Sequence, residues 1–177
     1  MNTDQRKPLW TSLLVPVDGS PQAAGALSLA CEIARSEGAR MVLCTALELP
    51  GVETQFAMAG YSDPGLIDRL TVQAETILNE AMSRGLAAGI THVETFLREE
   101  NPVQAILTLA KDQSVDLIVM GSHGRTGLQR LLLGSTTEGV IRQSPVPVLV
   151  VRHPDGIPET VHDDERAHAK AAQPAPA

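Results

Sequence analysis

Short apolar segments alternate with longer amphipathic segments along most of the chain. The apolar segments predict buried strands, because they are too short for helices and several are rich in β-branched residues. They span residues 12–17, 41–47, 115–120 and 148–151, and residues 92–97 alternate well enough to predict a further strand. We expect strands that are apolar throughout, joined by right-handed helical crossovers, as in a parallel sheet with helices on both faces. The pattern therefore predicts an α/β fold with a single doubly wound domain.

Capping signals mark the ends of the predicted helices. Ser20-Pro21 and Asn101-Pro102 each place a good N-cap residue before a proline that suits the first helical position. Gly38 predicts the end of the first helix, and apolar residues at helical spacing predict a long helix over residues 66–81. Residues 48–64 show no clear period, and a loop of that length is usually functional or mobile.

A glycine-rich segment follows the fourth predicted strand. Gly121 and Gly124, and then Gly134-Ser135, lead into a helix-like segment over residues 136–143. A backbone without Cβ atoms can wrap closely round phosphate oxygens, and the N-terminus of a helix presents unpaired N–H groups to an anion. Glycine also serves ordinary turns, and Ser135 would cap the helix with or without a ligand. The segment predicts an anion site, with phosphate as the favoured ligand.

Charge and composition exclude several classes of function. The chain has 14 Lys and Arg against 21 Asp and Glu, a net charge of −7, which argues against nucleic-acid or anionic-membrane binding. Cys31 and Cys44 lack metal-ligand spacing and indicate buried thiols in a reducing compartment. No apolar run approaches the roughly 20 residues that span a bilayer, and the first residues lack the apolar centre of a signal peptide. We therefore expect a cytoplasmic protein.

The catalytic motifs of common nucleotide-dependent enzymes are missing. No Gly-Lys-Ser/Thr sequence is present, so the glycine-rich segment is not a Walker P-loop. From Gly121 to Ser135 there is no carboxylate that could act as a general base on water. We expect nucleotide binding with at most slow hydrolysis.

The two ends of the chain differ from its middle. Residues 1–8 are polar, and we expect a flexible N-terminus. Residues 153–177 combine alanine, proline and mixed charge without apolar anchors, which predicts a disordered tail. The folded domain is expected over residues 9–152.

Several of these segments resemble the universal stress protein family, in its ATP-binding branch. They are Gly121-x2-Gly124-x9-Gly134-Ser135 between two apolar strands, VPVDGS near the N-terminus, MVLCTALEL in the second strand, and the closing SPVPVLVVR. The resemblance covers roughly residues 9–152. It implies a Rossmann-like fold of the adenine nucleotide alpha hydrolase type, with five parallel strands in the order 3-2-1-4-5. In such sheets ligands bind where the strand order reverses, here between the first and fourth strands.

The resemblance also implies a nucleotide site at that reversal. Asp18 would contact ribose or help to hold Mg²⁺ or Mn²⁺, although Asp-Gly is also an ordinary turn. The adenine edge would be contacted by backbone groups at Ala46, and the phosphates by the glycine-rich segment. Arg125 is a candidate for neutralising phosphate charge, and His123 for contacting phosphate or acting as a base, although such loop side chains mostly face water. The complete candidate set is Pro16, Val17, Asp18, Ala46, Met120, Gly121, Gly124, Arg125, Gly134, Ser135, Thr136 and Thr137.

Glu138 lies one turn into the helix that would hold phosphate. Its carboxylate would repel the phosphate unless a cation lay between them, which favours a magnesium or manganese complex.

The expected function is that of an ATP-binding stress-response switch or sensor, homodimeric through the edge strand at residues 147–151. Three alternatives remain: a cyclic AMP-binding member, a dimeric interaction module with an empty crevice, and a nucleotide hydrolase or transferase. The glycine spacing favours nucleotide binding over the interaction module. The missing lysine and general base count against the enzyme. The sequence does not identify a protein partner.

Overall fold

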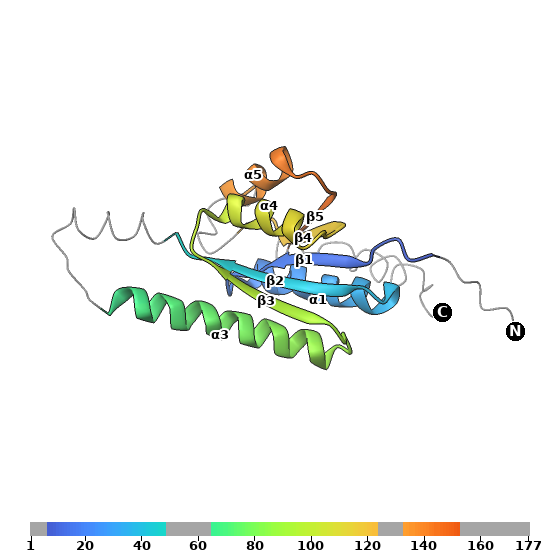
Figure 1. Ribbon diagram of the computed structural model, residues 1–177, viewed down its shortest axis with the longest axis horizontal. Coiled ribbons are helices and arrows are strands. Elements are labelled where there is room, and N and C mark those ends of the chain that lie inside the picture. The colour runs from blue at the N-terminus through green and yellow to red at the C-terminus, as the bar shows by residue number, and fades with distance from the viewer. Residues whose placement is uncertain (1–6, 49–64, 124–132, 153–177) are drawn as a thin grey trace, which may run out of the picture.

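The computed structural model describes residues 7–48, 65–123 and 133–152, and its centre is a five-stranded parallel sheet (Figure 1). The strand order is β3-β2-β1-β4-β5, which confirms the predicted order and fold class. The strands are β1 Ser12–Pro16, β2 Arg40–Ala46, β3 Val93–Arg98, β4 Leu117–Gly121 and β5 Val148–Val151. The helices are α1 Pro21–Glu37, α3 Leu66–Ala87, α4 Pro102–Asp112 and α5 Ser135–Gln143.

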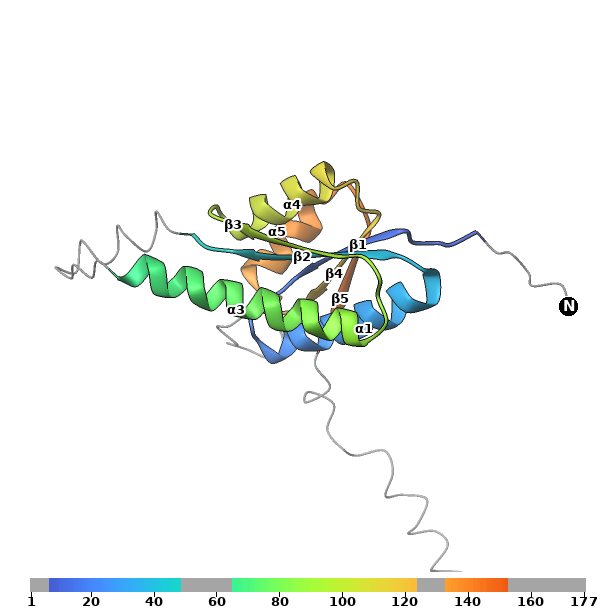
Figure 2. The same ribbon diagram turned by 60° about the horizontal axis from the view of Figure 1, so that its bottom comes forward.

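The helices cover the sheet in two layers. Figures 1 and 2 show α1 and α3 on one face and α4 and α5 on the other. Successive residues of a strand point to opposite faces, so β1 contributes to both cores. Leu13 and Val15 pack with α1 and α3, whereas Leu14 packs with α4, and all three side chains are fully buried. Two continuous aliphatic cores therefore hold the sheet between the helix layers.

The predicted capping residues cap their helices. The Ser20 hydroxyl oxygen accepts a hydrogen bond from the Ala23 N–H at 3.2 Å, at the start of α1. The Asn101 side-chain oxygen accepts one from the Val103 N–H at 3.0 Å, at the start of α4. Gly38 ends α1 in the left-handed conformation, with φ of 69°. These interactions span only two or three residues, which is why the sequence predicts them.

The expectation that every strand is apolar throughout is wrong for β3. This strand lies at the edge of the sheet, and its Glu94 and Thr95 side chains are exposed. Glu94 forms an ion pair with Arg40 on β2 at 3.0 Å. Solvent reaches β3 because it has a sheet neighbour on one side only. Residues 49–64 of the loop predicted over residues 48–64, and the tail from residue 153, lie outside the described residues, and so does the predicted flexible N-terminus up to residue 6.

No helix in the described part of the chain combines the length and apolar character needed to cross a membrane.

Candidate functional site

A cavity of about 330 Å³ opens at the carboxyl ends of the strands, where the sheet order reverses between β1 and β4. The strand ends, the first residues of α4 and the first turn of α5 surround it. Its lining consists of Pro16, Val17, Asp18, Ala23, Cys44, Thr45, Ala46, Leu47, Pro102, Ile106, Met120, Gly121, His123, Gly134, Ser135, Thr136 and Thr137. We call this space the switch-point cavity.

The end of β1 is held in place by β2. The Val17 N–H donates to the Cys44 carbonyl oxygen at 2.8 Å, and the Thr45 hydroxyl donates to the Val17 carbonyl oxygen at 2.7 Å. The Asp18 carboxylate then accepts the Ser20 N–H at 2.9 Å, so it turns the chain into α1. Asp18 is half-buried at the cavity wall, where its carboxylate can also serve a ligand.

The end of β4 lies against the start of α1. A Cβ atom at Gly121 would lie 2.9 Å from the backbone carbonyl carbon of Gln22, closer than real Cβ atoms come to such an atom. We expected this glycine to make room for phosphate oxygens. The structure gives a different reason for glycine here, because its missing side chain lets β4 and α1 approach closely. Gly121 still lines the switch-point cavity through its backbone.

The first turn of α5 faces the same cavity, and its N-cap residue supplies no side-chain cap. Gly134 is the N-cap residue, with an extended backbone (φ −64°, ψ 150°), and it makes no side-chain cap. Ser135 is the first helical residue and not the N-cap that the sequence predicts. An α-helix leaves its first N–H groups without intrahelical partners, so this turn presents donors and the positive end of a dipole. The arrangement suits an anion.

The Glu138 carboxylate is not placed to repel a bound phosphate as strongly as the sequence suggests. It does not line the switch-point cavity. Its carboxylate is exposed and forms an ion pair with Arg142, one turn further along α5, at 2.7 Å. The repulsion that favoured a magnesium or manganese complex is therefore weakened by distance, solvent and a local cation.

The structure brings together every predicted site residue that it describes. Ten of them line the switch-point cavity: Pro16, Val17, Asp18, Ala46, Met120, Gly121, Gly134, Ser135, Thr136 and Thr137. Gly124 and Arg125 lie outside the described residues. Over the part of the chain that the structure describes, no lysine or arginine lines the cavity, and Asp18 is its single carboxylate.

Sequence reasoning did not place Thr45, Pro102 and Ile106 in the site. Thr45 carries the one hydroxyl in an apolar strand, and that signal could have singled it out. Pro102 and Ile106 reach the cavity because α4 packs over β1 and β2, which no local pattern reveals.

The Cys44 thiol also lines the cavity. Burial raises the pKa of Cys44 to about 12, against a smaller lowering by the charge of Arg98. The thiol therefore stays protonated at neutral pH and acts as a small apolar group.

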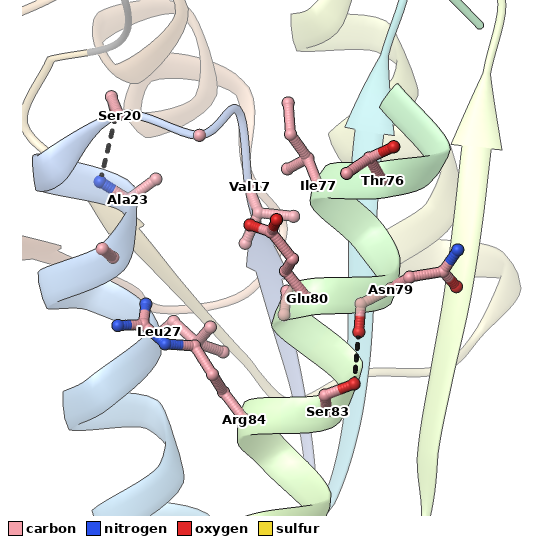
Figure 3. A pocket seen from close by; sticks show the side chains of 13 residues that line it. Val17, Ser20, Ala23, Leu27, Thr76, Ile77, Asn79, Glu80, Ser83 and Arg84 are labelled. Atoms are coloured by element: carbon pink, nitrogen blue, oxygen red, sulfur yellow. Dashed lines mark hydrogen bonds between the residues drawn. The ribbon is translucent and has the colours of Figure 1, made fainter. Parts of the chain in front are cut away.

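A second and larger cavity, of about 690 Å³, lies between α1 and α3. Figure 3 shows Arg84 of α3 projecting towards α1, and Glu80 of the same helix also lines this cavity. Val17 and Ala23 line this cavity as well as the switch-point cavity, so the loop that leads from β1 into α1 separates the two. No sequence signal indicated this second space.

Within residues 7–48, 65–123 and 133–152, the structure contains no group of three or more His, Cys, Asp or Glu side chains that could hold a metal ion. A cation at Asp18 would need further ligands, such as phosphate oxygens and water.

Comparison with known proteins gives a consistent result. The universal stress protein family model matches residues 10–152. The Bacillus subtilis universal stress protein YxiE is 32% identical over 151 residues, which cover 81% of this chain and 100% of that protein. A universal stress protein of Thermus aquaticus is 32% identical over 145 residues, which cover 81% of this chain and 100% of that one.

Two solved structures show the same fold. The protein MJ0577 of Methanocaldococcus jannaschii superimposes with a TM-score of 0.69 at 29% identity, covering 81% of this chain and 96% of that chain. A universal stress protein solved in complex with cAMP superimposes with a TM-score of 0.58 at 31% identity, covering 81% and 97%. With a family match over most of the sequence and full-length relatives above 30% identity, the chain belongs to the universal stress protein family.

Proposed function

We propose that the switch-point cavity binds an adenine nucleotide, with ATP as the favoured ligand. The observation that carries this proposal is the meeting of three surfaces in one cavity. An apolar wall from Val17, Ile106 and Met120 suits a base, the Asp18 carboxylate suits ribose hydroxyls, and the uncapped first turn of α5 suits phosphate. A relative of 31% identity was solved in complex with cAMP, which supports an adenine nucleotide as the ligand.

Cyclic AMP is the second candidate ligand. The base and ribose surfaces would bind ATP and cyclic AMP equally. The two ligands would differ only in the contacts that their phosphate groups make. We favour ATP because Gly124 and Gly134-Ser135 keep the spacing that resembles the ATP-binding branch. Gly124 and Arg125 would complete the phosphate region.

Catalysis would be slow at most. Asp18 is the single carboxylate lining the described part of the cavity, and one of its oxygens already accepts the Ser20 N–H. A general base must be within reach of the attacking water, and no second carboxylate of the described lining could take that role. A bound and slowly hydrolysed nucleotide suits a switch or sensor in the stress response. Free Cys31 and Cys44 thiols suit the reducing cytoplasm.

We propose that the protein acts as a homodimer joined through β5. All four residues of β5 are half-buried, and β5 pairs with β4 on one side. Within the described residues no strand pairs with its other side. Such an edge offers unpaired backbone groups to a second copy.

Isothermal titration calorimetry with Mg-ATP and with cyclic AMP tests the ligand. Ala46→Phe places a large side chain at the lining and should lower the affinity of the preferred nucleotide by at least about tenfold. Ala24→Phe is the matched control, because Ala24 lines the cavity between α1 and α3 and not this one. Wild-type protein that gives no heat with either nucleotide would refute the proposal. Mass spectrometry of small molecules released on denaturation would identify any nucleotide carried from the cell.

A further inference from the structure

One ring nitrogen of His123 has no partner in the described protein. His123 follows β4 and lines the switch-point cavity together with the first turn of α5. Its Nδ1 atom lies 3.1 Å from the hydroxyl oxygen of Ser122, a buried residue. Its Nε2 atom is buried and forms no hydrogen bond with any residue that the structure describes. Burial of a polar nitrogen without a partner is unfavourable, so a ligand that supplied one would be stabilised.

The position of the ring favours the phosphate end of the ligand. The Gly134 N–H donates to the Ser122 carbonyl oxygen at 2.9 Å, which holds the residue next to His123 against the N-cap of α5. His123 therefore follows directly after a residue that is bonded to the N-cap of α5, and both His123 and the first turn of α5 line the cavity. Asp18, at the end of β1, is a hydrogen-bond acceptor and suits the ribose hydroxyls. An Nε2–H of His123 is a hydrogen-bond donor and suits a phosphate oxygen.

We propose that His123 donates a hydrogen bond from Nε2 to a phosphoryl oxygen of the bound nucleotide. In the tautomer that this proposal requires, the Ser122 hydroxyl donates to Nδ1 and the ring proton is on Nε2, so Ser122 is a positioning residue. A hydrogen bond to β5 fixes the Ser122 backbone, because the Ser122 N–H donates to the Val151 carbonyl oxygen at 2.9 Å. This inference rests on the proposed nucleotide binding and adds a side-chain phosphate ligand, in a cavity whose described lining contains no lysine or arginine.

Calorimetry on three variants tests the role of His123. His123→Ala should lower the affinity for Mg-ATP about ten- to hundredfold, the range for a hydrogen bond to a charged group, and should leave the affinity for adenosine within about twofold. His123→Gln should recover most of the ATP affinity, because its amide nitrogen reaches the position of Nε2. His92→Ala is the matched control, since His92 is exposed and precedes β3 at the opposite end of the sheet.

Nitrogen-15 NMR of the imidazole provides a readout that a purely structural role would not change. With ATP bound, Nε2 should carry the proton and its resonance should shift, and adenosine should leave that resonance unchanged. An ATP complex in which Nε2 lacks a proton would overturn the inference, and so would a His123→Ala variant that binds ATP as tightly as wild type. Equal losses of ATP and adenosine affinity would also overturn it, because they would indicate general damage to the cavity. Wild-type protein that gives no heat with ATP would refute the proposed ligand itself, which is a separate result.

Discussion

The Thr137 hydroxyl donates a hydrogen bond to the Gly121 carbonyl oxygen at 2.9 Å. Thr137 lies in the first turn of α5 and Gly121 ends β4, so this bond joins two of the elements that form the switch-point cavity. The Thr137 side chain is buried, at 3% exposure, and solvent does not compete for the bond. The position of the α5 N-terminus at the cavity therefore depends on a side chain as well as on the backbone.

Thr137→Val should both destabilise the fold and weaken nucleotide binding. Valine keeps the shape of threonine but leaves the buried Gly121 carbonyl oxygen without a donor, at a cost of about 1–3 kcal/mol in the free energy of unfolding. Urea denaturation measures this cost and calorimetry measures the affinity. Thr76→Val is the control, because the exposed Thr76 hydroxyl donates within its own helix to the Val72 carbonyl oxygen at 2.8 Å. That variant should change stability by less than about 0.5 kcal/mol. Similar losses in both variants would contradict the assigned role of Thr137.

Gly121→Ala should be strongly destabilising although it adds a single methyl group. The new Cβ atom would meet the Gln22 backbone, which cannot rotate away, so β4 and α1 would have to separate. We expect a loss of about 1–3 kcal/mol in the free energy of unfolding. Gly85→Ala is the comparison, because its Cβ atom would lie 3.3 Å from the Val93 side chain, and alanine is the better helix former. It should be neutral or slightly stabilising. A fully stable Gly121→Ala protein would disprove the packing explanation for this glycine.

The local features of the fold were predictable and the long-range contacts were not. Ser20 and Asn101 cap helices within three residues of themselves, so the sequence predicts both caps. Asp18 and Gly121 meet because the carboxyl ends of parallel strands share one edge, and the resemblance supplies the strand order. The contact of Gly121 with Gln22 depends on how α1 crosses the sheet, and no sequence period contains that information.

The N-terminus of α5 shows a local limit as well. Gly134 and Ser135 are both common N-cap residues, and the sequence does not distinguish them. The structure shows that Gly134 is the N-cap residue, because its backbone is extended, and that Ser135 is the first residue of the helix. Ile106 could not be assigned to the site from sequence, because an apolar residue on a helix stripe is expected in the core in any case.

Asp116→Ala should reduce stability while leaving nucleotide affinity intact. The Asp116 carboxylate accepts hydrogen bonds from the Thr11 N–H at 2.9 Å, the Thr11 hydroxyl at 2.7 Å and the Ser12 N–H at 3.2 Å. These contacts hold the start of β1 beside β4, at the opposite end of the strands from the cavity. Hydrogen bonds to a charged group contribute about 1.5–3 kcal/mol. Urea denaturation should show the loss, and a tenfold loss of affinity in folded protein would contradict the separation of the two ends.

The Cys44 thiol should make the protein less stable at alkaline pH. The pKa of Cys44 is raised to about 12 in the fold, from an ordinary value of 9.0. Between these values the unfolded chain loses the thiol proton and the folded chain keeps it, so stability falls as pH rises. The slope is about 1.4 kcal/mol per pH unit from this group alone. Other groups titrate in the same range, so the measurement is the difference between wild type and Cys44→Ala in urea denaturation from pH 8 to 11. Parallel stability curves for the two proteins would contradict the raised pKa.

Val150→Pro should dissociate the proposed dimer without unfolding the subunit. The Pro147 and Val151 carbonyl oxygens accept hydrogen bonds from β4, from the N–H groups of Ile118 and Ser122. Because backbone groups alternate in direction along a strand, the N–H of Val150 points to the open edge of β5. Proline removes that donor and obstructs strand pairing there, so sedimentation equilibrium should give a monomer with a native far-UV spectrum. Leu149→Pro is the informative contrast, since it removes a donor that faces β4 and should destabilise the subunit itself. A Val150→Pro protein that remains dimeric would show that the two copies meet on another surface.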